Sequence, residues 1–95
     1  MTKLKTDSYA SVWDAITDTP EEAANLRLRS ELMDKITALI QKNGWTQLEA
    51  AKRCSVTQAR INELLRGRIS RFSLDALVNI AALLGRRVHV ELEAA

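Results

Sequence analysis

Two helix starts lie only eleven residues apart in this chain, at Thr46 and Thr57, and this spacing constrains the fold more than any other feature. A threonine side chain can accept hydrogen bonds from the backbone N–H groups that the first turn of a helix leaves unpaired. Glu49, three residues after Thr46, can complete a capping box, and Gly67 favours the left-handed conformation that ends a helix. Residues 46–67 therefore predict two short helices joined by a tight turn.

Both helices are amphipathic, which predicts the faces that they bury. We expect the inward residues to be Leu48, Ala51 and Cys54 in the first helix and Ile61, Leu64 and Leu65 in the second. Ala50 is small enough to let the second helix cross closely over the first. The face of the second helix that turns outward carries Ala59, Asn62, Glu63 and Arg66, flanked by Gln58 and Arg60.

The outward face has the chemistry of a helix that reads DNA in a helix-turn-helix. Glutamine and asparagine can pair bidentately with adenine, arginine with guanine, and alanine can touch a thymine methyl group. The candidate base-reading residues are Gln58, Ala59, Arg60 and Asn62. Polar groups beside helix starts and nearby arginines suit phosphate oxygens. The candidate phosphate-binding residues are Thr46, Gln47, Thr57, Arg66, Arg68 and Arg71.

The charge distribution supports this interpretation, although the formal net charge of the chain is only +2. Residues 1–45 hold six basic and seven acidic side chains, whereas residues 46–95 hold eight basic and five acidic ones. Within residues 52–71, six basic side chains accompany a single acidic one. Positive charge thus coincides with the predicted motif, as a nucleic-acid-binding surface requires. The alternative is that these charges only solvate a helical face.

The motif resembles the helix-turn-helix of the lambda-repressor and Cro-like (XRE) superfamily, in which T-Q-x-x-x-A is followed by T-Q-x-x-I-x-x-L-x-x-G. The sequences S-V-W-D-A-I at 11–16, G-W-T-Q-L-E-A-A at 44–51 and S-R-F-S-L-D-A-L-V at 70–78 are similar to antitoxins of the HigA type. The resemblance implies an all-α, five-helix DNA-binding domain. It also implies a repressor of its own operon and, as partner, a RelE-like ribonuclease toxin.

Ser55 departs from the family pattern, because most relatives have glycine in this turn to adopt a positive φ. Serine in that conformation costs about 1 kcal/mol. We therefore expect a turn of slightly different geometry here.

Residues 1–19 predict an N-terminal extension with a short amphipathic helix, since Tyr9, Val12, Trp13 and Ile16 recur at helical spacing. Tyr9 and Trp13 are candidates for binding a partner protein. The alternative is that Trp13 folds back on the body of the domain.

Residues 20–85 predict the DNA-binding domain, in which two further helices flank the motif. Thr19 and Pro20 begin a long helix, and Ser73 and Gly85 delimit the last one. The residues expected to face the core are Leu28, Leu32, Ile36, Leu39 and Ile40, widened by Leu26 and Met33, in the long helix, and Leu74, Leu77, Val78, Ala81 and Leu84 in the last.

Residues 86–95 change to an alternating pattern, which predicts a short C-terminal β-strand with Val88, Val90 and Leu92 on its apolar face. A single strand leaves its backbone groups unpaired, so it must pair with a second copy, with a bound partner, or locally with Leu4 and its neighbours. A homodimer is the economical choice, because two-fold symmetry presents two recognition helices to major grooves about 34 Å apart. These three residues are therefore the candidates for dimerisation.

The remaining features indicate a small cytoplasmic regulator without a cofactor or metal. Ninety-five residues allow one domain, and a single cysteine, Cys54, fits a reducing compartment. No apolar run near 18 residues and no signal sequence are present, so we expect no membrane span. The one histidine, His89, lies on the polar face of the predicted strand. The absence of a nucleophile with a matching base argues against an enzyme.

Three functions remain open: an antitoxin-like repressor, a stand-alone transcription factor of the XRE type, and a helical interaction module that does not bind DNA. The identity of the neighbouring gene separates the first two, and titration with promoter DNA separates both from the third.

Overall fold

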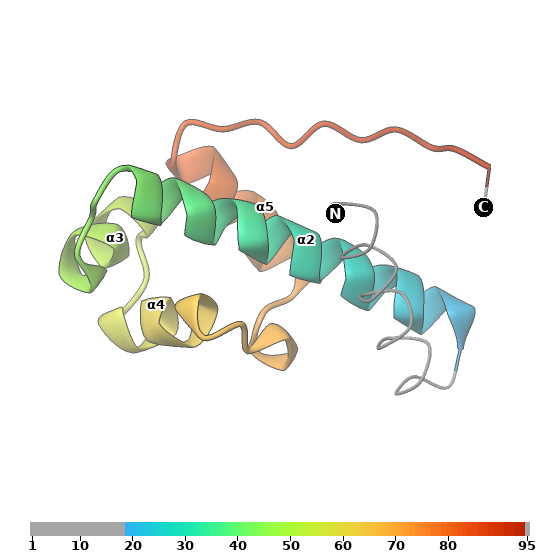
Figure 1. Cartoon of the computed structure of the whole chain (residues 1–95), viewed down its shortest axis with the longest axis horizontal. Helices are drawn as coiled ribbons and strands as arrows, with labels where there is room; N and C mark the ends of the chain where they lie inside the picture. Colours follow the sequence, from blue (N-terminus) through green and yellow to red (C-terminus); the bar gives the residue numbers. More distant parts are fainter. Residues whose placement is uncertain (1–18, 95) are drawn as a thin grey trace.

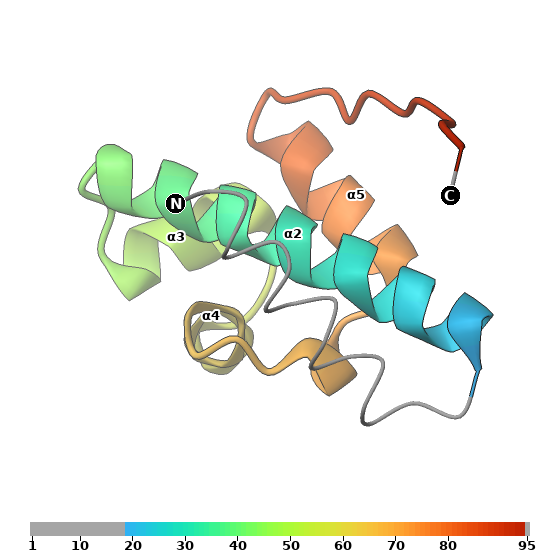
Figure 2. The same cartoon turned by 45° about the vertical axis from the view of Figure 1, so that its right-hand side comes forward.

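The computed structural model describes residues 19–94 and folds them into four α-helices and one short 3-10 helix (Figure 1). The elements are α2 (Pro20–Lys42), α3 (Gln47–Cys54), α4 (Gln58–Leu65), η1 (Ile69–Arg71) and α5 (Leu74–Leu83). Figures 1 and 2 show α2 crossing the molecule, with α4 and η1 on one side and α5 and the C-terminal segment (residues 86–94) on the other. The predicted N-terminal helix, with Tyr9 and Trp13, lies outside the described residues.

Every α-helix of the described chain begins at the hydroxyl residue that the sequence predicts. Each capping oxygen accepts a hydrogen bond of 3.1 Å from the backbone N–H three residues later, and the caps are Thr19, Thr46, Thr57 and Ser73. Gly67 and Gly85 follow α4 and α5 at φ values of 73° and 76°, which confirms the predicted left-handed stops. The ends of the helices are therefore specified by contacts within a few residues of chain.

The core lies where α2 packs against the other helices. It consists of Met33, Ile36, Ile40, Ala50, Ala51, Cys54, Ile61, Leu64, Phe72, Leu77 and Ile80. Ala50 is completely buried, in agreement with the expected close crossing at this position. Phe72 follows η1 and is only 1% exposed, so it anchors the loop after α4 in the core. Its aromatic ring contributes a large share of the apolar surface that stabilises so small a domain.

Three residues expected in the core are exposed instead: Leu28 by 45%, Leu48 by 53% and Val78 by 39%. In α3 the buried residues are Ala50, Ala51 and Cys54, so the helix is rotated away from Leu48. In α5, Ile80 is buried in place of Val78. Both helices carry apolar residues on more than one face, and packing against the neighbouring helices decides which face is buried.

The predicted fold class needs two corrections. Residues 20–85 hold four α-helices rather than five, because the loop after α4 forms only the three-residue η1. The predicted C-terminal strand is also wrong for the single chain, since residues 86–94 are extended without belonging to a sheet. A strand requires a neighbour that supplies ladder hydrogen bonds, and no other part of residues 19–94 is a strand.

The C-terminal segment passes beside α2 and α5 and leaves an apolar groove of about 840 Å³ between them. Leu28, Val78 and Val88 are among the residues that line it. Of the residues predicted for dimerisation, Val88 is half-buried, Val90 is 69% exposed and Leu92 is 97% exposed. None of the helices within residues 19–94 combines the length and apolar character needed to cross a lipid bilayer.

Candidate nucleic-acid interface

The turn between α3 and α4 has left-handed backbone geometry at Ser55. Ser55 adopts φ 54° and ψ 42°, close to the ideal left-handed helical values. The N–H groups of Ser55 and Val56 donate to the carbonyls of Lys52 and Ala51, which closes the end of α3. The expectation of a different turn is therefore wrong. Serine is exposed here and small, so the turn that brings α4 across α3 is kept at the expense of backbone strain at one residue.

The start of α3, the outer face of α4 and the residue Arg68 form one shallow groove, which we call the interface groove. Its lining residues are Gln47, Thr57, Gln58, Ala59, Arg60, Asn62, Glu63, Arg66 and Arg68. Eight of the ten residues predicted to contact DNA are in this set, and only Thr46 and Arg71 are not. Side chains from separate parts of the sequence thus form one continuous surface.

The predicted base-reading residues all line this groove but differ in their exposure to solvent. Gln58 and Ala59, at the start of α4, are exposed, and Asn62 is half-buried one turn later. Arg66 and Arg68 are exposed beyond the other end of the helix. The polar side chains that could meet base edges are therefore concentrated at the beginning of α4.

Three of the six predicted phosphate-binding residues lie at helix starts. Thr46 and Thr57 accept capping hydrogen bonds from the backbone, but each hydroxyl still carries a hydrogen that can be donated to a phosphate oxygen. Gln47 is half-buried at the start of α3 and lines the interface groove. The N-terminal ends of α3 and α4 also place partial positive charge at this surface.

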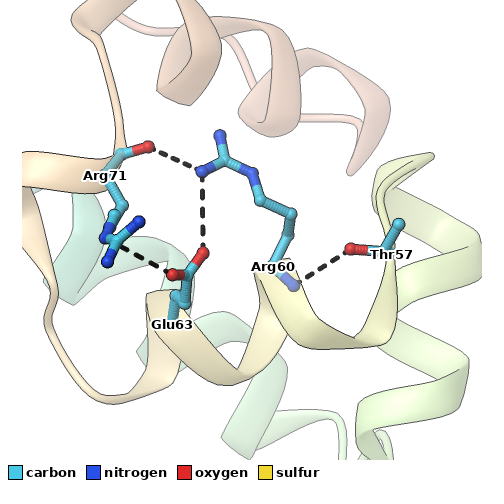
Figure 3. Close-up of polar contacts among 4 residues, drawn as sticks. All are labelled: Thr57, Arg60, Glu63 and Arg71. Atoms are coloured by element: carbon cyan, nitrogen blue, oxygen red, sulfur yellow. Dashed lines mark hydrogen bonds and ion pairs between the residues drawn. The ribbon is translucent and has the colours of Figure 1, made fainter.

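Arg60 turns toward the loop after α4 rather than away from the protein (Figure 3). Its guanidinium carbon lies 4.1 Å from the centre of the Phe72 ring. Its Nη1 donates to the carbonyl oxygen of Arg71 at 2.6 Å and lies 3.8 Å from Oε1 of Glu63. Arg60 therefore has three contacts within the protein, which helical spacing alone does not reveal.

Some basic residues of the motif form ion pairs with Glu63 or Glu49, and the others do not. Its Oε2 lies 3.5 Å from Nε of Arg71, so one carboxylate contacts both Arg60 and Arg71. On α3, Nε of Arg53 lies 2.9 Å from Oε2 of Glu49. Three basic residues of the segment have no ion pair within residues 19–94, and these are Lys52, Arg66 and Arg68. The uncompensated positive charge is consequently smaller than the sequence count indicates.

Arg29 of α2 holds the loop after α4 through hydrogen bonds, and the sequence analysis did not identify this role. Its Nη1 donates to the carbonyl oxygens of Ile69 at 3.3 Å and Phe72 at 3.1 Å, while its Nε donates to Oδ1 of Asn25 at 2.7 Å. Arg29 precedes the buried Met33 by four residues, so it occupies a position on the apolar stripe of α2. A basic residue at a position on the apolar face of α2 was the sequence feature that could have pointed to this role.

The fold and the interface groove define a helix-turn-helix DNA-binding module. Residues 15–93 match the sequence profile of a family described as a helix-turn-helix domain, and the chain belongs to this family. No curated protein matches the chain at a significant level.

Proposed function

We propose that this protein is a sequence-specific transcriptional repressor that inserts α4 into the major groove of operator DNA. The observation that carries the proposal is the interface groove, in which amide and basic side chains line the outer face of one helix of a helix-turn-helix. An α-helix fits the major groove, where each base pair presents its own pattern of donors and acceptors.

The proposed roles of the residues follow from their positions in the interface groove or, for Thr46 and Arg71, outside its lining. Gln58, Ala59 and Asn62 meet base edges and set sequence preference. Thr46, Gln47, Thr57, Arg66, Arg68 and Arg71 contact phosphates and set the register of the protein on the duplex. Arg60 could meet a base edge only by giving up its contacts with Phe72, Glu63 and the carbonyl of Arg71.

The repressor acts as a homodimer in this proposal, joined through Val88, Val90 and Leu92. Val90 and Leu92 expose apolar surface on an extended segment whose backbone has no sheet partner within residues 19–94. A second copy would remove that surface from water. It would also supply the second α4 that a two-fold symmetric operator requires.

The wider assignment rests on the resemblance to HigA-type antitoxins. On that basis the protein acts in the cytoplasm, represses its own operon and binds a RelE-like toxin, with Tyr9 and Trp13 as candidate contacts. A stand-alone transcription factor of the XRE type is the alternative. Co-purification of a small basic protein encoded by the adjacent gene would support the antitoxin assignment, and the absence of such a gene would support the alternative.

The DNA-binding proposal is tested by fluorescence anisotropy with the promoter region of the protein's own gene and a shuffled duplex of equal length. We expect the protein to prefer the promoter by about 1000-fold. Gln58→Ala should reduce that preference by about 10-fold, because one base contact is lost. The matched control is Gln41→Ala, which removes an exposed glutamine outside the interface groove. Equal affinity of the unmodified protein for both duplexes would contradict sequence-specific repression.

A further inference from the structure

The loop after α4 is held by two arginines that come from different helices. Nη1 of Arg29, on α2, donates to the carbonyl oxygens of Ile69 and Phe72. Nη1 of Arg60, on α4, donates to the carbonyl oxygen of Arg71, which lies between them in the loop. A guanidinium group presents several donors in a fixed plane and suits such bridging. Two side chains thus bind three carbonyl groups of one short loop to α2 and α4.

The contact of Arg60 with Phe72 strengthens this attachment. The guanidinium group lies over the ring at 4.1 Å, within the range at which the ring face attracts a cation. Phe72 is 1% exposed and belongs to the core, so it cannot move without repacking that core. Arg60 therefore links the surface of α4 to a side chain that is fixed in the core.

Glu63 extends the arrangement to the side chain of Arg71. Its two carboxylate oxygens face Arg60 at 3.8 Å and Arg71 at 3.5 Å (Figure 3). The Arg71 side chain is 60% exposed, so solvent screens this ion pair, and its main effect is on orientation. The position of Arg71 relative to α4 consequently depends on a backbone contact with Arg60 and on a side-chain contact with Glu63.

We propose that Arg60 is a positioning residue, which together with Arg29 holds the loop 68–72 so that Arg68 and Arg71 contact DNA phosphates while α4 occupies the major groove. This inference rests on the proposed DNA-binding function and assigns Arg60 a role other than base reading. Arg60 acts through its neighbours, because its Nη1 and the face of its guanidinium group already make contacts inside the protein.

The test compares Arg60→Met, Arg60→Lys and the control Arg53→Met. Methionine keeps much of the length and packing of the side chain but has neither charge nor donors, whereas lysine keeps the charge and loses the planar group. Arg53 is a matched control because it also lies over an aromatic ring, Trp45 at 4.4 Å, and pairs with a glutamate. Within residues 19–94 Arg53 forms no hydrogen bond or ion pair with the loop, so its removal should leave the loop unchanged.

The first measurement is hydrogen exchange by NMR without DNA, after thermal melts establish that each variant is folded. The N–H groups of Arg71 and Phe72 donate within the turn to Arg68 and Ile69. We expect their exchange to become at least about 10-fold faster in Arg60→Met and Arg60→Lys and to stay unchanged in Arg53→Met, since only a held loop protects these hydrogens.

The second measurement is affinity for promoter and shuffled duplexes over a range of salt concentrations. Arg60→Met should weaken binding to the two duplexes by the same factor. The slope of log K against log salt concentration should become shallower by about 2, which is the loss expected for two phosphate contacts. A residue with a merely structural role would not change this slope in folded protein. Adding Arg68→Ala to Arg60→Met should weaken binding by less than the product of the two single effects.

Three results would overturn the inference. A loss of promoter preference with unchanged exchange would make Arg60 a base-reading residue. Faster exchange with unchanged affinity and slope would make the contacts merely structural. Full rescue of both measurements by lysine would mean that charge alone matters. If the unmodified protein shows no promoter preference, the repressor proposal fails, whereas exchange and the salt slope on the shuffled duplex still decide the role of Arg60.

Discussion

Replacing Ser55 by glycine should make the protein more stable, because this residue combines a left-handed backbone with an L side chain. Its φ and ψ of 54° and 42° lie near the centre of the left-handed region, which costs a non-glycine residue about 1 to 2 kcal/mol. Ser55 is exposed, and its hydroxyl makes no hydrogen bond with the described part of the chain. Removing the side chain therefore relieves strain without breaking a polar contact.

The net gain is smaller than the strain, because glycine also gives the unfolded chain more freedom. That entropy amounts to about 0.5 to 1 kcal/mol. The free energy of unfolding should then rise by about 0.5 to 1 kcal/mol, which raises Tm by about 2 to 8 °C for a domain of this size.

The assay is thermal and urea denaturation followed by circular dichroism. Ser70→Gly is the matched control, since Ser70 is also exposed but lies in η1 with a negative φ. Glycine at that position should lower stability by about 0.5 to 1 kcal/mol. Ser55→Val should lower it too, because a β-branched residue is disfavoured at positive φ. A lower Tm for Ser55→Gly, or equal effects at both serines, would refute the reasoning.

Two further predictions concern the core and the C-terminal segment. Burial raises the pKa of the Cys54 thiol, so we expect iodoacetamide to leave the folded protein unmodified at pH 8 and to react once urea unfolds it. As pH rises, the thiol loses its proton in the unfolded chain before it does so in the folded protein. The contribution of Cys54 to stability is therefore complete below the ordinary thiol pKa, and it is lost as pH rises through the higher pKa of the folded state. Urea midpoints of the protein and of Cys54→Ala against pH would measure that loss, and parallel curves would argue against it. Deleting residues 88–95 should yield monomers with weak operator binding, and an unchanged dimer mass by sedimentation would count against this segment as the joint.

The features that could be predicted from the sequence depend on neighbours close along the chain. Thr19, Thr46, Thr57 and Ser73 each cap a helix through a backbone group three residues away. Such contacts leave a visible pattern in the sequence. The part of the interface groove that α4 forms could also be anticipated, because helical periodicity places Ala59, Asn62 and Glu63 on the outward face of this helix.

The features that could not be predicted depend on contacts between distant parts of the chain. Arg29 bonds to carbonyl groups 40 and 43 residues away, and Arg60 turns toward a ring that a loop brings beneath it. Leu48 is exposed because tertiary packing selected another face of α3. Helical periodicity describes each helix alone and carries no information about these choices.

A carboxylate within the interface groove has a consequence for how such a protein would locate its operator in a genome. Glu63 lines the groove and is partly exposed, so it opposes the indiscriminate attraction between arginines and the phosphates of any duplex. Weaker retention at wrong sites shortens each unproductive encounter. Since a genome offers about a million or more competing sites, we expect the acidic residue to shorten the search even though it lowers the total attraction for DNA.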